Sequence, residues 1–246
     1  TELNKATTAQ TSTITLENDL DISDDAGVTV QGPNLDFQGI FYLTAGTDKI
    51  ASLTIDGQGY AIAGTNTSGQ NFDPSKKYVF YLDGSGDSPI TFKNLTIENT
   101  NILAFNLFNL NNLKFDKVAL KNNAEGGLHL NSAQLEATDF TTSGNGKFAV
   151  KLSRERDNKP KLTLVSGTIG EKDVPQIAFF DRHAYKAWSA NPESSIEDIS
   201  NAVVTPAGEN WYRSLQYAKM HTSNNSRLAY VWTKDNASVS VSTAVQ

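Results

Sequence analysis

The fold is decided by the stretch Ile90-Thr-Phe-Lys-Asn-Leu-Thr-Ile-Glu-Asn99, because its pattern occurs four times between residues 90 and 170. The pattern is apolar, any residue, apolar, two others, apolar, any residue, apolar, and then a small or polar residue. Later copies start at Leu113, Leu135 and Leu162, so the starts are separated by 113 − 90 = 23, 135 − 113 = 22 and 162 − 135 = 27 residues. A repeat of roughly 20–50 residues is typical of a solenoid.

Each copy contains two short runs in which every second residue is apolar. This alternation places Leu95 and Ile97 on one face of a strand and Thr96 and Glu98 on the other. A third apolar run lies between the copies, at residues 104–107, 128–130 and 148–152. Three short strands in about 22 residues predict an all-β chain that folds as a right-handed parallel β-helix, in which stacked coils bury their inward side chains together.

The rest of the chain extends this helix into one domain over residues 1–246. We expect an N-terminal cap or linker at 1–12, coils at 13–181, and an irregular, partly helical capping region with final strands at 182–246. Helical spacing is found at residues 194–199 and 209–218. An earlier copy at residues 50–62 aligns Leu53 with Leu95 and Ile55 with Ile97.

Composition narrows the classes of function. The 246 residues carry a net charge of −6 and no cysteine, so thiolate metal sites, thiol nucleophiles and disulfides are excluded. Lysine and arginine do not gather as nucleic-acid binding requires, and no apolar run approaches the ~20 residues of a membrane helix. We expect no nucleic-acid partner and no membrane insertion within this fragment, and we expect the signal and anchor segments to lie outside it.

Residues 52–62, Ser-Leu-Thr-Ile-Asp-Gly-Gln-Gly-Tyr-Ala-Ile, followed by 90–99, resemble the coils of the pectate-lyase-like β-helix superfamily. The nearest resemblance is to the pectate-lyase-like adhesive domains of bacterial cell-surface proteins, which often open with Ile-Thr-Leu-x-x-Asp-Leu-x-Ile, as residues 14–22 do. The likeness covers residues 13–170. It implies a non-catalytic adhesive domain of a secreted bacterial protein, located outside the cell at its surface, that binds host or matrix glycans or proteins without a cofactor. A self-associating adhesin is one alternative.

A polysaccharide lyase or glycoside hydrolase acting on acidic polysaccharide is the other alternative. In β-helix lyases, acidic residues bind Ca²⁺ and a basic residue removes a proton. The conceivable calcium ligands are Asp83, Asp87, Asp116 and Asp139, and the conceivable bases are Lys121, Lys151, Arg154 and Arg156. Asp116 and Asp139 miss alignment in the repeat by one residue, which favours solvated turns. The Gly-His-Gly and Arg-x-Lys motifs of polygalacturonase-type hydrolases do not occur, so we expect no catalytic residues and no metal.

Polar residues outside the repeat offer one candidate ligand site. It consists of Asp181, Arg182, His183, Tyr185 and Trp188. Aromatic faces stack on sugar rings, and arginine or histidine can donate to hydroxyls. The alternative is that these residues close the open end of the helix.

Histidines and asparagines within the repeat are expected to have ordinary structural roles. His129 stands between Leu128 and Leu130, so it is predicted to point outward, whereas His183 and His221 are far away in sequence. Asparagines end several coils, namely Asn94, Asn99, Asn122 and Asn145. Because stacked asparagines can bond to one another and tolerate left-handed turns, they are predicted to be structural. Specificity is expected in the two segments that interrupt the repeat, 63–88 and the residues after Asp181.

Overall fold

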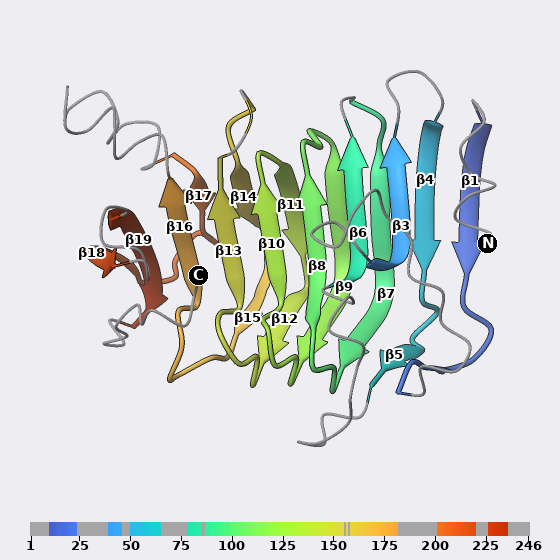
Figure 1. Ribbon diagram of the computed structural model, residues 1–246, viewed down its shortest axis with the longest axis horizontal. Helices are drawn as coiled ribbons and strands as arrows, with labels where there is room; N and C mark the ends of the chain where they lie inside the picture. Colours follow the sequence, from blue (N-terminus) through green and yellow to red (C-terminus); the bar gives the residue numbers. More distant parts are fainter. Residues whose placement is uncertain are drawn as a thin grey trace.

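The computed structural model describes residues 10–23, 39–45, 50–64, 78–84, 87–154, 156, 158–181, 201–219 and 226–235. Within these residues the chain forms 19 strands in two sheets and no helix. The described part of the chain therefore holds no apolar helix that could cross a membrane. The two sheets lie face to face, with one in front of the other in Figure 1.

Sheet A has 11 strands and sheet B has 8. Sheet A consists of β1 (Gln10–Thr15), β2 (Leu20–Asp21), β4 (Ile50–Asp56), β5 (Ala61–Ala63), β7 (Ile90–Glu98), β9 (Leu113–Lys121), β11 (Gln134–Thr138), β12 (Phe140–Ser143), β14 (Lys161–Leu164), β15 (Gly167–Ile169) and β17 (Val203–Val204). Sheet B consists of β3 (Gly39–Ala45), β6 (Tyr78–Gly84), β8 (Leu103–Phe108), β10 (Leu128–Asn131), β13 (Val150–Ser153), β16 (Ile177–Asp181), β18 (Trp211–Lys219) and β19 (Ser226–Lys234). The chain alternates between the sheets, so neighbours within a sheet come from successive coils.

Strand register confirms the repeat. Leu113 pairs with Ile90 on one side and with Leu135 on the other, and Leu135 pairs with Leu162, all in parallel. The first two runs of each copy meet at a corner where the backbone has positive φ, at Asn94, Lys117 and Asp139. β7 and β9 continue through this corner, whereas the next coil breaks into β11 and β12. With β8, β10 and β13 as the third runs, the parallel β-helix is confirmed.

The alignment predicted for residues 50–62 is wrong. Leu53 pairs with Ile90 and Ile55 with Phe92, one run earlier than expected. The cause is the turn after Asp56, which adds two residues before β5 brings Ile62 opposite Ile97. Gly57 makes this turn possible, because a Cβ atom there would lie 2.4 Å from the carbonyl oxygen of Asn94.

The helix predicted at residues 209–218 is also wrong, because this segment forms β18. It runs antiparallel to β19, which pairs antiparallel with β16 and so extends sheet B. Pairing with β19 supplies the backbone hydrogen bonds that a helix would have made internally, and tertiary context of this kind overrides local helical spacing. The Arg213 guanidinium also lies 5.7 Å from the centre of the Tyr230 ring. The predicted strand near the chain's end is confirmed by β19, whereas residues 194–199 lie outside the described residues.

The core is a column of phenylalanine rings between the sheets. Phe92, Phe115 and Phe140 come from sheet A, and Phe80 and Phe105 come from sheet B. Each is at most 2% exposed. A fully buried phenylalanine stabilises a fold by about 1.5–3 kcal/mol relative to an exposed one, so this column holds the two sheets together.

Two asparagine ladders run along the coils. The predicted one includes Asn99 and Asn122, where Asn122 Nδ2 donates to Asn99 Oδ1 at 3.2 Å. Asn145 belongs instead to a second, fully buried ladder, in which Asn123 Nδ2 donates to Asn145 Oδ1 at 3.0 Å. This ladder ends at Glu171, whose Oε1 accepts from Asn145 Nδ2 at 2.7 Å. The ladders satisfy polar groups inside the coil turns, so their role is structural.

Candidate ligand-binding face

Several charges on the outer face of sheet A are already paired. Lys93 Nζ lies 3.0 Å from Asp56 Oδ2, on the neighbouring strand. Two further pairs join neighbouring strands at longer distances: Lys114 with Glu136 at 3.8 Å and Lys121 with Glu98 at 3.9 Å. Exposed pairs of this kind add only about 0–1 kcal/mol each to stability. The paired side chains do neutralise one another's charges, so these residues offer little net charge to a charged ligand.

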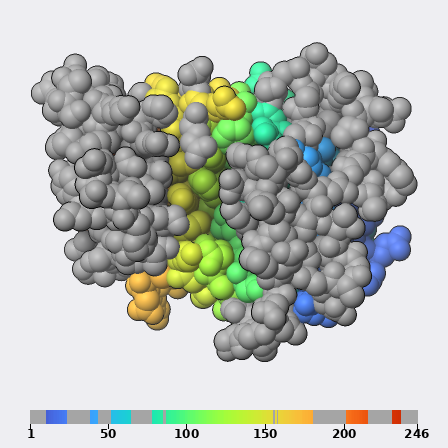
Figure 2. All heavy atoms as spheres, in the orientation of Figure 1, coloured from blue at the N-terminus to red at the C-terminus, as the bar shows by residue number. Residues whose placement is uncertain are grey.

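The outer face of sheet B is different, because aromatic and amide side chains dominate it. We define the sheet B face as the outward residues of two rows that cross the strands. The first row is Tyr42, Tyr81, Asn106, His129 and Lys151, and the second is Asp83, Phe108, Asn131 and Ser153. Their neighbours along each strand, such as Leu128 and Leu130, point into the core. Figure 2 shows green to yellow atoms of the central coils reaching the surface in the middle of this side of the molecule.

Asn106 and Asn131 are the unusual members of this face. The two residues are only 6% and 5% exposed, and neither buried Oδ1 atom has a hydrogen-bond partner among the described residues. A buried polar atom without a partner costs about 1–3 kcal/mol, and native proteins contain few of them. A ligand that supplied the missing hydrogen bonds would recover this cost on binding.

His129 points outward, as predicted, and links the two rows. Leu128 and Leu130 are fully buried on either side of it, whereas His129 is partly exposed. Its Nε2 lies 2.7 Å from Ser153 Oγ on β13. This bond crosses from the first row to the second beside Asn131, so it holds the histidine ring toward β13.

Tyrosine rings flank the amides on one side. Tyr42 and Tyr81 occupy paired positions on β3 and β6, and their rings stack with centres 5.6 Å apart. Tyr81 then pairs with Asn106 on β8. The Tyr81 ring is fully buried, but Tyr42 is partly exposed. The face thus places the partly exposed Tyr42 ring and the buried amide groups on strands of the same sheet.

A charged pair closes one end of the second row. Asp83 is partly buried at the end of β6, and Arg156 lies close enough to act on its charge. The Arg156 guanidinium also lies 5.6 Å from the centre of the Phe108 ring. Burial raises the pKa of Asp83, and the positive charge of Arg156 offsets part of that rise.

Replacing Asp83 with asparagine is expected to raise the melting temperature at pH 7. The pKa of Asp83 is raised above its ordinary value of 3.8, so the fold favours the protonated carboxyl group. The resulting stabilisation is fully present below pH 3.8 and is lost as the pH rises through the folded-state pKa. Asp83→Asn keeps the shape and removes the buried charge. Thermal unfolding followed by circular dichroism should show a gain at pH 7 and almost none at pH 3. A lower melting temperature at pH 7 would show that the charge of Asp83 is favourable.

The candidate site at Asp181, Arg182, His183, Tyr185 and Trp188 stays a prediction. Asp181 ends β16 directly after Phe180, which pairs with Ser153 of the sheet B face. Its backbone therefore lies beside this face. The other four residues lie outside the described residues.

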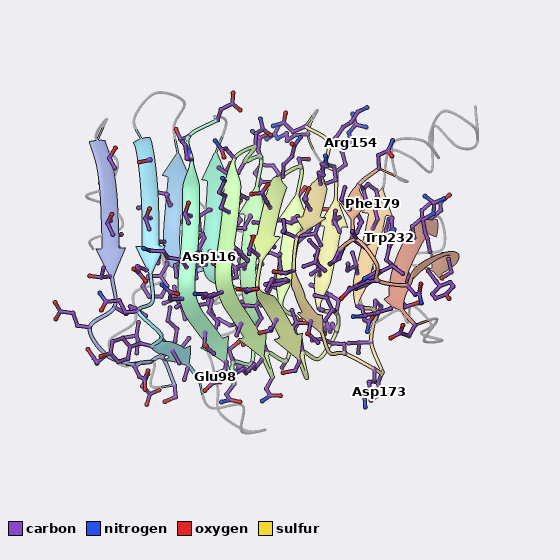
Figure 3. All side chains as sticks on the ribbon, turned by 180° about the vertical axis from the view of Figure 1, so that it is seen from behind. Glu98, Asp116, Arg154, Asp173, Phe179 and Trp232 are labelled. Atoms are coloured by element: carbon purple, nitrogen blue, oxygen red, sulfur yellow. The ribbon has the colours of Figure 1, made fainter. Side chains whose placement is uncertain are left out.

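The aspartates considered as calcium ligands are not brought together. Asp83 lies on sheet B, whereas Asp116 lies over the middle of sheet A, as Figure 3 shows. Asp116 pairs with Thr138, so the predicted one-residue offset from Asp139 is confirmed. Asp87 Oδ1 instead accepts from Asn111 Nδ2 at 3.2 Å. Within the described ranges, no group of three or more histidine, aspartate or glutamate side chains is placed to hold a metal.

Sequence reasoning missed Asn106 and Asn131. A signal for Asn106 was present: it is the one polar residue in Leu103-Ala-Phe-Asn-Leu-Phe108, a run that is buried on both faces. Asn131 follows Leu-His-Leu and resembles the asparagines that end other coils. It therefore could not be told from a turn residue by sequence alone.

The fold defines a class of protein, the parallel β-helix. A family model described as "Putative pectate lyase-like adhesive domain" matches residues 2–132, more than half of the chain. The chain belongs to this family, as the resemblance in its coils predicted. Neither the curated proteins nor the solved structures contain a match to the chain. The matched residues include Asn106, His129 and Asn131.

Proposed function

We propose that this chain is a non-catalytic adhesive domain of a secreted bacterial protein, displayed at the cell surface, that binds host or matrix glycans or proteins. The family description supports an adhesive role in general. The observation that carries the proposal is the sheet B face, where the buried Oδ1 atoms of two asparagines have no partner among the described residues and stacked tyrosine rings lie on the neighbouring strands. Features of this kind suit ligand recognition better than structural packing.

The scaffold suits adhesion because it is preorganised. From β6 through to β13 the strands of the sheet B face are hydrogen-bonded on both sides, whereas β3 is the last strand in the described sheet. A ligand therefore meets side chains whose positions are already fixed, which lowers the entropic cost of binding. Adhesive proteins also gain avidity when several copies are displayed together, because linked sites raise the effective concentration of ligand.

Binding without turnover tests the proposal. The purified chain is applied to an array of glycans and matrix proteins, and every ligand that binds is then incubated with it in solution. We expect saturable binding to at least one ligand, with the ligand recovered intact by mass spectrometry. Release of unsaturated products or new reducing ends would contradict a non-catalytic function. Antibody labelling of intact, unpermeabilised cells tests the surface location.

The alternative function is cleavage of an acidic polysaccharide, and the pair Asp83 and Arg156 favours it. A carboxyl group with a raised pKa beside an arginine is an arrangement that proton-transfer enzymes use. If this pair were catalytic, the chain would release products from polygalacturonate, and Arg156→Gln would abolish that release. Intact polygalacturonate after prolonged incubation, with and without Ca²⁺, would remove this alternative.

A further inference from the structure

A buried row of polar side chains runs through the turns of four successive coils, behind β7, β9, β12 and β15. Its members are Thr100, Asn123, Asn145 and Glu171, and each is at most 3% exposed. We call this row the inner ladder. Its members are joined from coil to coil by hydrogen bonds between their side chains.

The two asparagines of the inner ladder use their hydrogen-bond donors in the same way. The backbone N–H and Nδ2 of Asn123 both donate to Asn145 Oδ1, at 3.2 and 3.0 Å. The same two groups of Asn145 both donate to Glu171 Oε1, at 3.4 and 2.7 Å. Each Nδ2 also donates to a carbonyl oxygen of the preceding coil, that of Ile97 or that of Leu120. Each amide therefore bridges two neighbouring coils, and its donors depend on an oxygen of the next coil toward the C-terminus.

Glu171 is the firm end of the inner ladder. A carboxylate only accepts hydrogen bonds, so it cannot pass the row on to a further coil. Its Oε1 takes both donors of Asn145, and its Oε2 accepts from Thr142 Oγ1 at 2.5 Å. No described lysine or arginine forms an ion pair with Glu171. These donors therefore compensate for the burial of its charge, and hydrogen bonds to a charged group are about twice as strong as neutral ones.

Thr100 is the weaker end of the row. Its Oγ1 lies 2.8 Å from Asn123 Oδ1 and 3.0 Å from the carbonyl oxygen of Ile102. A hydroxyl group has one proton to donate, so these two acceptors share it. The hydroxyl also leaves the two donors of Asn123 untouched, because both point to the next coil.

Gln176 fixes the turn that carries Glu171. Its Nε2 donates to the carbonyl oxygens of Glu171 and Ile169, at 3.0 and 3.2 Å. Its Oε1 accepts from the backbone N–H of Lys234 on β19 at 2.8 Å. The firm end of the inner ladder is therefore tied to the antiparallel pair of β18 and β19.

We infer that the inner ladder is a conformational device that couples the coil turns in one direction, with Glu171 as its anchor. Loosening of Glu171 frees Asn145, and the freed Asn145 side chain then releases Asn123, two coils from Glu171. Loosening of Thr100 does not spread in the opposite direction. Stacked coils interact chiefly with their nearest neighbours, and proteins open locally in cooperative units, so this row of turns forms one such unit. The inference concerns local opening of the fold and is independent of the proposed function.

Hydrogen exchange at the backbone N–H of Asn123, followed by NMR, tests the inference. This N–H donates to the side chain of Asn145 and so reports on the inner ladder. Glu171→Ala removes the anchor, and we expect exchange at Asn123 to become about tenfold faster, which corresponds to about 1.4 kcal/mol. Glu171→Gln keeps one acceptor oxygen and removes the charge, so we expect a smaller increase, of about threefold.

Two controls separate the device from general destabilisation. The neighbouring N–H of Asn122 donates to the carbonyl oxygen of Ser143, outside the inner ladder, and should exchange at the wild-type rate in both Glu171 variants. Thr100→Val removes a buried hydroxyl group at the other end of the row. It should leave exchange at Asn123 unchanged.

Faster exchange at Asn123 with an unchanged rate at Asn122 supports the coupling. Faster exchange at Asn145 alone would show that loosening stops after one coil, and would overturn it. Equal acceleration at Asn122 and Asn123 would show general destabilisation and would also overturn it. An effect of Thr100→Val as large as that of Glu171→Ala would remove the direction. If Glu171→Ala does not fold, Glu171→Gln decides by the same comparisons.

Discussion

Phe105→Ala is expected to lower the free energy of unfolding by about 3–5 kcal/mol, the usual cost of removing a buried phenylalanine ring. The Phe105 ring is fully buried at the centre of the core. Its centre lies 5.1 Å from that of Phe80, 4.9 Å from that of Phe92 and 5.0 Å from that of Phe115. Because Phe80 belongs to sheet B and the other two belong to sheet A, the cavity would open where the sheets meet.

Urea unfolding of the purified variant measures this loss. Tyr60→Ala is a suitable control, because the Tyr60 ring is exposed, and surface truncations usually change stability by less than about 0.5 kcal/mol. A loss below about 1 kcal/mol for Phe105→Ala would show that the aromatic column does not hold the sheets together.

Gly167→Ala is expected to cause the second large loss, of at least about 2–3 kcal/mol. Gly167 starts β15 with a φ of +141°, a conformation that is strained by about 1–3 kcal/mol for any other residue. In addition, a Cβ atom at this position would lie only 1.9 Å from the carbonyl oxygen of Phe140. Phe140 is the strand partner of Gly167 on β12, so the clash would push the two strands apart.

Gly208→Ala separates the two causes. Gly208 also has a positive φ, of +83°, but nothing lies within 4 Å of the position that a Cβ atom would take. Its alanine variant should therefore show backbone strain without a clash. Urea unfolding should give a clearly larger loss for Gly167→Ala than for Gly208→Ala. Equal losses would mean that the β12 and β15 contact is looser than the structure shows.

The sequence predicted the fold well where the repeat is strict and failed where local signals compete with it. Between residues 90 and 170 every predicted repeat start lies in the expected register, because two-residue corners and period-2 alternation leave one way to stack the coils. The alignment failed at Gly57, where a glycine turn adds residues that no apolar pattern reveals. The helix prediction failed at β18, whose long-range pairing with β19 outweighs helical spacing.

The candidate site was harder to predict than the fold. The alternation of apolar residues correctly predicts that His129 points outward, because this prediction only assigns each residue to one of the two faces of a strand. Whether an outward side chain is exposed or buried depends on its neighbours across several coils, and these are not visible in one strand. Asn131 therefore looks like a solvated turn residue in the sequence, and Asn106 stands out only as the one polar residue in an apolar run, although both are almost fully buried in the structure.

A crystal structure of the wild-type chain with a bound ligand from the array would locate the binding surface directly. We expect an intact ligand over the sheet B face, beside Asn106 and Asn131. A cleaved ligand, or one bound over the paired charges of sheet A, would contradict the proposed function.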